Sequence, residues 1–211
     1  MVERGCSCLI TQHIRSLTQL MEIATDVRMR SSMDKIGLPS SSPSSPTSAT
    51  DRKLTATDFL ARAVDLATES ARNEGGPFGA IIVAADGRVF EGTNRVTANL
   101  DPSAHAEVTA IRAACQGLGT FDLTGAVLYT SCEPCPMCLA TSLWARIDRV
   151  HFAADRHDAA AAGFDDAVFY QYFEGDPEAR LMMPVSQDEL PPRQRVAPFT
   201  EWNRNTGRTE Y

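Results

Sequence analysis

The sequence predicts an α/β protein, a three-layer α/β/α sandwich built around a mixed five-stranded sheet. Two observations indicate this fold class. Segments with apolar residues at helical spacing alternate with short apolar runs that are typical of buried strands. One pair of strands is joined by a tight turn and the later strands are separated by helices, so antiparallel and parallel pairing are both expected.

The chain of 211 residues is expected to divide into three parts. Residues 39–50 consist mainly of proline, serine and threonine and have little to bury, which predicts a flexible linker. Residues 51–211 are long enough for one folded domain with a sizeable core. Residues 1–38 form an N-terminal extension, for which a short amphipathic helix at 9–24, a disordered tail and a later translation start are alternative interpretations.

The folded domain is expected to begin with a helix and a β-hairpin. Residues 57–73 carry one apolar stripe at helical spacing, and the Gly-Gly-Pro-Phe-Gly sequence at 75–79 ends that helix. Residues 80–84 read Ala-Ile-Ile-Val-Ala, which predicts a buried strand. The Asp-Gly pair at 86–87 is a tight-turn signal, and the chain returns through a second strand at 88–91.

A second helix is expected from Ala104 to about Gln116. An Asp-Pro-Ser turn precedes it, and Ser103 is the predicted N-cap. Residues 126–130 form an apolar, partly β-branched run that predicts a third strand, and another helix begins near Cys135. The last two strands are expected at 149–153 and 181–185, the second at an edge because it contains a proline.

Composition excludes several classes of protein. The net charge is −7 and the pI about 5.1, without the basic stripe that proteins gripping a nucleic-acid backbone show. No apolar run approaches the roughly 20 residues that span a bilayer, and the N-terminus lacks the apolar core of a secretory signal. The six cysteines suit a reducing compartment. We therefore expect a cytoplasmic protein that acts on a small molecule, without nucleic-acid or membrane partners.

Two short motifs supply candidate metal ligands. A His-Ala-Glu motif provides His105, and a Pro-Cys-Pro-Met-Cys motif provides Cys135 and Cys138. One imidazole and two thiolates suit Zn²⁺, and three protein ligands leave the fourth tetrahedral position open, as in catalytic zinc sites. Both motifs fall at predicted helix N-termini, whose positive ends favour thiolate over thiol. The metal does not need Glu107, which is placed to take a proton from a water. This combination is the signature of zinc-dependent base and nucleoside deaminases.

Each motif alone would have other interpretations. A lone Cys-x-x-Cys is also typical of redox pairs and of half of a structural zinc site, and a histidine at a helix start is often only a polar end residue. Cys132 adds a third thiol at the same spacing as the other two. The proline directly before Cys135 favours the later pair as ligands, and Cys132 is expected to pack as a small buried side chain.

The chain after the linker resembles the bacterial guanine deaminases, which have a cytidine-deaminase-like fold. The resemblance extends from about Thr57 to Tyr211 and leaves out the N-terminal extension. It is carried by five segments, namely residues 75–80, 101–112, 129–138, 158–166 and 198–211.

The resemblance implies roles for single residues. His105, Cys135 and Cys138 match zinc ligands, and Glu107 matches the residue that transfers protons. The other implied roles concern the purine. Phe78 stacks on its ring, Asn94 hydrogen-bonds it, Ala106 and Trp144 lie beside it, and Asp166 is a second catalytic carboxylate next to its 2-amino group. Tyr211 ends a tail that closes over the substrate, and the family implies a homodimer that exchanges such tails.

Without the resemblance, the residues assigned to the purine allow purely structural interpretations. Asp166 would be an exposed helix cap, Phe78 and Trp144 core side chains, and Asn94 a turn residue. The expected reaction is the hydrolysis of guanine to xanthine and ammonia. The alternatives are deamination of guanosine, another aminopurine, cytosine or an aminotriazine, deamination of adenosine in tRNA, and a zinc-binding module without catalysis.

Overall fold

The computed structural model describes residues 54–73 and 75–211, which belong to one compact unit, Asp51–Tyr211. The predictions for the N-terminal extension and for the linker fall outside these residues. Within this part of the chain, no helix is long and apolar enough to cross a membrane.

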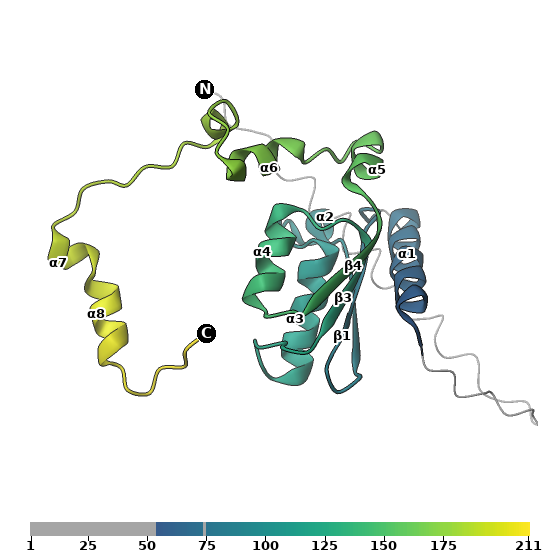
Figure 1. The fold of residues 1–211 in the computed structure, drawn as a ribbon, viewed down its shortest axis with the longest axis horizontal. Coiled ribbons are helices and arrows are strands. Elements are labelled where there is room, and N and C mark those ends of the chain that lie inside the picture. The colour runs from purple at the N-terminus through teal and green to yellow at the C-terminus, as the bar shows by residue number, and fades with distance from the viewer. Residues whose placement is uncertain (1–53, 74) are drawn as a thin grey trace, which may run out of the picture. The chain divides into compact units, whose positions relative to one another are not determined.

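A four-stranded mixed sheet forms the centre of the fold (Figure 1). Its order is β2-β1-β3-β4, with β1 antiparallel to both of its neighbours and β3 parallel to β4. The strands are β1 (Gly79–Val83), β2 (Val89–Thr93), β3 (Val127–Cys132) and β4 (Arg149–Ala154). The helices that pack on the sheet are α1 (Ala56–Arg72), α3 (Ala106–Leu118) and α4 (Pro136–Trp144), and a short helix, α2 (Val96–Asn99), follows β2.

The predicted fifth strand at 181–185 is wrong. The chain instead forms a 3₁₀ helix, η1 (Ala179–Met182), and continues without regular structure. Leu181 and Val185 are largely exposed, so this apolar run has no layer to pack against, and Pro184 has no amide to donate to a ladder. The remaining elements of this region are α5 (Arg156–Ala161), α6 (Ala167–Glu174), α7 (Pro192–Arg195) and α8 (Ala197–Arg204).

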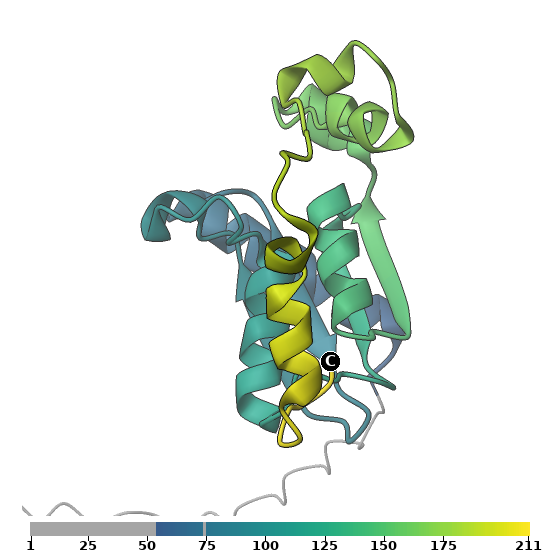
Figure 2. The same cartoon turned by 90° about the vertical axis from the view of Figure 1, so that its left-hand side faces the viewer.

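The two faces of the sheet bury separate cores. Ile81 and Tyr129 point to the face that α1 covers, where they pack with Ala63 and Leu66. The opposite face is covered by α3 and α4, which lie side by side in Figure 2. Its core holds Ala80, Ile82, Ala106, Ala110, Ile111, Ala114, Leu123, Ala126, Leu128 and Ala145. The alternation of side chains along β1 explains this division, because neighbouring residues of a strand face opposite layers.

Gly92 brings α3 directly onto the sheet. A Cβ atom at this position would lie 2.4 Å from both the carbonyl oxygen of Ala106 and the amide nitrogen of Ala110. Only a residue without a side chain permits this contact between β2 and the helix backbone. The N-terminal turn of α3, which carries the first motif, is thereby held against the sheet.

Candidate functional site

His105 stands at the N-terminus of α3. It is itself the N-cap residue, with φ −65° and ψ 160°, so the prediction of Ser103 as the N-cap is wrong. The amide and hydroxyl of Ser103 instead donate to Oδ1 of Asp101, at 2.8 and 2.6 Å. Arg112 donates to Oδ2 of Asp101 at 3.2 Å and to Oγ of Ser103 at 3.1 Å. This hydrogen-bonded turn holds the backbone that leads into the histidine.

Cys135 and Cys138 occupy the first turn of α4, as expected. Cys135 is the N-cap residue and Pro136 the first helical residue, where a missing amide proton costs no helical hydrogen bond. β3 ends at Cys132, so the strand delivers the turn that presents the thiols. Cys138 is fully buried and Cys135 partly so.

The three predicted metal ligands converge on one point. Nδ1 of His105 lies 3.6 Å from Sγ of Cys135 and 3.5 Å from Sγ of Cys138, and all three atoms lie within 4.8 Å of one another. Zn–N and Zn–S bonds of about 2.0–2.1 and 2.3 Å at a tetrahedral angle separate nitrogen from sulfur by about 3.6 Å. The donor set and its spacing therefore fit Zn²⁺.

The ionisation of Cys135 favours cation binding, because a thiolate is the form of cysteine that ligates a metal. A hydrogen bond from the Cys138 thiol, together with one from His105, lowers the pKa of Cys135 to about 4. The same thiol pair raises the pKa of Cys138. Contact with Cys135 raises the pKa of His105. Cys135 is thus the thiolate and Cys138 holds its proton. A cation that binds between them would displace the proton of Cys138.

Glu107 lies one residue into α3, beside the ligands. Its side chain is buried, with 6% of the residue exposed, and loss of solvent raises the pKa of its carboxyl group above the ordinary value. A carboxyl group whose pKa is shifted towards neutrality can both accept and return a proton near pH 7. Ala106, beside it, is fully buried in the core, so any contact of this residue with a ligand would come from its backbone.

Asp166 occupies the N-cap position of α6 without capping the helix. No hydrogen bond joins its side chain to the first turn, whereas Oδ1 of Asp165 accepts the amide of Ala167 at 3.0 Å. Loss of solvent and the nearby charge of Cys135 raise the pKa of Asp166. The side chain of Asp166 therefore does not cap α6, and the cap function falls to Asp165.

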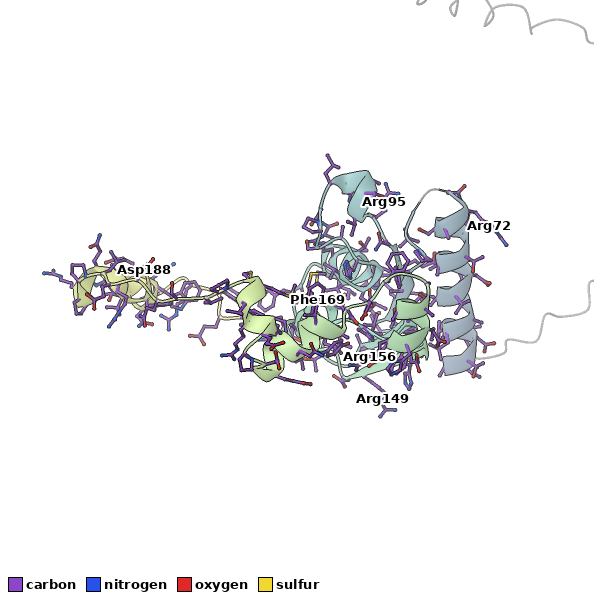
Figure 3. All side chains as sticks on the ribbon, turned by 90° about the horizontal axis from the view of Figure 1, so that it is seen from above. Arg72, Arg95, Arg149, Arg156, Phe169 and Asp188 are labelled. Carbon is purple, nitrogen blue, oxygen red and sulfur yellow. The ribbon has the colours of Figure 1, made fainter. Side chains whose placement is uncertain are left out.

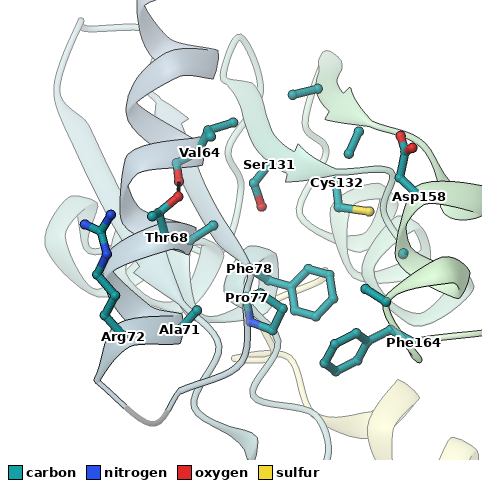
Figure 4. A pocket seen from close by; sticks show the side chains of 15 residues that line it. Val64, Thr68, Ala71, Arg72, Pro77, Phe78, Ser131, Cys132, Asp158 and Phe164 are labelled. Carbon is teal, nitrogen blue, oxygen red and sulfur yellow. Dashed lines mark hydrogen bonds between the residues drawn. The ribbon is translucent and has the colours of Figure 1, made fainter.

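Phe78 and Asn94 are adjacent in space. The amide of Asn94 donates to the carbonyl of Phe78 at 3.1 Å, and Oδ1 of Asn94 accepts the amide of Val96 at 3.2 Å. This leaves the side-chain amino group of Asn94 as the donor for a ligand. The ring of Phe78 meets Phe164 edge to face at 5.0 Å between centroids (Figure 4).

A groove of about 560 Å³ adjoins this aromatic pair. Its wall includes Phe78, Phe164, Ser131 and Cys132, and its floor is formed largely by alanines of α1, β4 and α5. Loss of solvent raises the pKa of Cys132 to about 11, and its Sγ contacts the carbonyl of Asp155 at 3.6 Å. Cys132 thus packs as a protonated, buried side chain, as expected, and is not part of the ligand cluster.

Trp144 and Tyr211 do not reach the ligand cluster within one chain. Trp144 ends α4, six residues after Cys138, which places it about 9 Å further along the helix axis. Its ring lies 6.2 Å from that of Tyr211, which also contacts Phe121 and Trp202. Trp144 and Tyr211 remain 68% and 71% exposed, so neither behaves as a core side chain.

Sequence reasoning missed three residues next to the ligands. Glu133 and Arg156 form an ion pair, and the hydroxyl of Tyr170 donates to the carbonyl of Pro134 at 3.0 Å. The one local signal was the position of Glu133 directly before the Pro-Cys motif. Arg156 lies on α5 and Tyr170 on α6, and no local pattern connects these helices with that motif.

Comparison with known proteins agrees with this geometry. Residues 54–154 match the family described as the cytidine and deoxycytidylate deaminase zinc-binding region. The guanine deaminase of Bacillus subtilis is 48% identical over 154 residues, which are 72% of this chain and 97% of that protein. Its X-ray structure aligns with a TM-score of 0.67 and 45% identity over 75% of this chain and 99% of that one. The tRNA-specific adenosine deaminase of Agrobacterium fabrum is 41% identical, over 46% of this chain and 64% of that protein.

The match to the Bacillus protein, at 154 residues, is longer than the zinc-binding region at residues 54–154. The chain therefore belongs to the zinc-dependent deaminase family that includes the guanine deaminase of Bacillus subtilis.

Proposed function

We propose that the protein catalyses the zinc-dependent hydrolysis of guanine to xanthine and ammonia. The observation that carries this proposal is the convergence of His105, Cys135 and Cys138 beside the buried carboxyl group of Glu107. Guanine is the substrate in the name of the Bacillus relative, which this chain matches over 97% of that protein's length.

His105, Cys135 and Cys138 would hold the zinc ion. Bound there, zinc supplies Lewis acidity and lowers the pKa of a coordinated water to about 7. Glu107 would take one proton from the attacking water and deliver it to a ring nitrogen. It would then carry the second proton of that water, from the new hydroxyl group on C2, to the amine that departs as ammonia. The buried carboxyl group of Glu107 suits this exchange. Proton transfer by a positioned group contributes roughly 10²- to 10⁴-fold to a rate.

The remaining residues would bind and orient the purine. Phe78 offers a ring face, and the amino group of Asn94 offers a donor to an acceptor on the base. Asp166 offers an acceptor to the amine at C2, which presents N–H donors. Its raised pKa, which results from loss of solvent and the charge of Cys135, allows it to share in moving a proton at that amine.

We further propose a homodimer in which the C-terminal tails are exchanged. Trp144 and Tyr211 lie away from the ligands of their own chain and are exposed, together with Leu143 of the same helix. A second copy would cover this apolar surface and would bring each tail to the partner's purine site.

Sedimentation at micromolar concentration tests the dimer. A mixture of a Glu107→Gln chain with a chain that lacks the last residues should regain activity if tails are exchanged.

The proposed setting is the cytoplasm, where the four described cysteines would stay reduced, as zinc ligation requires.

The decisive assay is release of ammonia from a panel of amines, with and without a zinc chelator. Guanine should be the best substrate, ahead of guanosine, other aminopurines, cytosine and aminotriazines. Zinc-loaded protein that leaves guanine unchanged would refute the proposal. Inosine formation in a tRNA anticodon stem-loop would favour the function named for the Agrobacterium relative.

A further inference from the structure

The segment that carries Asp166 has little core of its own. No residue of α5 or α6 is fully buried, and most of residues 155–178 are exposed. Packing therefore contributes little to the position of Asp166 relative to the zinc ligands. That position must depend on a few specific contacts between this segment and the turn that presents Cys135.

The first of these contacts is made by Tyr170. Its hydroxyl donates to the carbonyl of Pro134 at 3.0 Å, and Pro134 is the fully buried residue directly before Cys135. Tyr170 follows Asp166 by four residues, so both side chains lie on the same face of α6. The hydrogen bond thus fastens this face of the helix to the ligand turn.

The second contact is made by Arg156, the first residue of α5. Its Nε lies 3.1 and 3.2 Å from the two carboxylate oxygens of Glu133, its Nη2 donates to the same carboxylate, and its backbone amide donates to Glu133 at 3.1 Å. The guanidinium carbon also lies 3.9 Å from the centre of the Tyr170 ring. Figure 3 labels Arg156 on α5 and Phe169, the neighbour of Tyr170, on α6.

This arrangement differs from an ordinary surface ion pair. The side chain of Glu133 is only 18% exposed and that of Arg156 38% exposed, and the fork geometry gives several hydrogen bonds at once. Glu133 belongs to the ligand turn, Arg156 to α5 and Tyr170 to α6. We name this set the Glu133–Arg156–Tyr170 clamp.

We infer that the clamp is a positioning device for the deamination reaction: Arg156 and Tyr170 hold Asp166 at the distance from the zinc ligands that the reaction needs. The inference rests on the proposed function and extends it to residues that touch neither the metal ligands' side chains nor the purine. Loss of the clamp should lower kcat more than it raises KM, because the backbones of Phe78 and Asn94, which would bind the purine, lie outside the segment that the clamp holds.

The test compares Tyr170→Phe with Tyr172→Phe. Both variants remove one hydroxyl of α6 that donates to a backbone carbonyl, but Tyr172 donates to Met183, at 2.8 Å and away from the ligand turn. For Tyr170→Phe we expect full zinc content, a kcat for guanine lower by about five- to tenfold, the range for one lost hydrogen bond, and a KM within about twofold. Amide hydrogen exchange should rise in residues 155–174 and stay unchanged in β1 and β3. Tyr172→Phe should change neither kcat nor exchange around Asp166.

A second pair of variants examines the ion pair. Arg156→Lys keeps the charge but loses the fork and the stacking, so it should lower kcat by about tenfold or more. Arg62→Lys is its control, because Arg62 makes a two-point contact with Glu91, at 2.9 and 3.1 Å, far from the ligand turn.

The outcomes separate the clamp from the proposed function. Unchanged exchange in Tyr170→Phe would overturn the clamp whatever the substrate. Raised exchange with unchanged kcat would show a structural contact only, which also overturns the inference. If the wild-type protein does not turn over guanine, the proposed function fails on that result alone, and the exchange comparison still decides whether the clamp holds the Asp166 segment.

Discussion

Nδ1 of His105 lies 3.5 Å from Sγ of Cys138, although 33 residues separate them in the chain. The first stands at the N-terminus of α3 and the second in the first turn of α4, and both helices pack on one face of the sheet. Two helix N-termini thus meet at one point, where their positive ends favour the thiolate form of cysteine and the thiolate in turn favours a cation.

Removal of one ligand should remove the metal. Cys138→Ser is expected to reduce bound zinc from one equivalent per chain to well below that value and to abolish deamination, because an alcohol is a poor substitute for a thiolate. Metal analysis after dialysis measures the effect. Cys115→Ser is the control, since Cys115 lies within α3 outside the ligand cluster. Full zinc content in Cys138→Ser would contradict the proposed ligand set.

Glu107→Gln should separate metal binding from turnover. The amide fills the same space but cannot take a proton, so kcat is expected to fall by at least 10²-fold while zinc content and the unfolding temperature change little. Steady-state ammonia release and metal analysis on the same preparation test this. Activity close to that of the wild type would rule out Glu107 as the residue that transfers protons.

Replacement of Asp165 by alanine should lower stability, whereas replacement of Asp166 by alanine should lower kcat. Asp165→Ala removes the hydrogen bond to the amide of Ala167 and is expected to cost about 1 kcal/mol of local stability with little change in kcat. Asp166→Ala should lower kcat by at least tenfold without a loss of helix stability, because no hydrogen bond joins its side chain to the first turn. Kinetics and amide exchange on both variants decide between the cap and the catalytic interpretation.

Gly92→Ala should destabilise the fold. The added methyl group would lie 2.4 Å from two backbone atoms of α3, so the helix must shift away from β2, at a cost of about 1–3 kcal/mol in the free energy of unfolding. Chemical denaturation measures the loss. The control is Gly207→Ala, where a Cβ atom would meet its nearest neighbour at an ordinary 3.6 Å. Equal stability of the two variants would show that α3 is not held at this contact.

Acid should remove the contribution of Asp101 to stability. Hydrogen bonds from Ser103 and the ion pair with Arg112 lower the pKa of Asp101 below 3.8 in the folded state. The stabilisation is therefore complete above the unfolded-state pKa and is lost as the pH falls through the lower, folded-state value. Asp101→Asn should be less stable than the wild type at pH 7, and this difference should shrink below about pH 4. Denaturation curves from pH 7 to 2.5 test this, with Asp188→Asn as an exposed control.

The sequence alone predicted the ligand cluster because each half of it is local. Cys135 and Cys138 are three residues apart behind a helix-start proline, and His105 and Glu107 follow a turn, so short-range signals place both pairs at helix N-termini. Strands β1 to β4 were predicted for the same reason, since a run such as residues 80–84 is apolar enough to require burial.

Tertiary structure decided everything that depends on which surfaces meet. Residues 181–185 have the composition of a strand but no layer to cover them, so the fifth strand does not form. Asp165 and Asp166 are identical in chemistry, and only the structure shows that Asp165 caps α6 while the side chain of Asp166 makes no cap hydrogen bond. Arg156 and Tyr170 reach Glu133 and Pro134 across 23 and 36 residues of sequence, a distance over which backbone propensity and spacing carry no information.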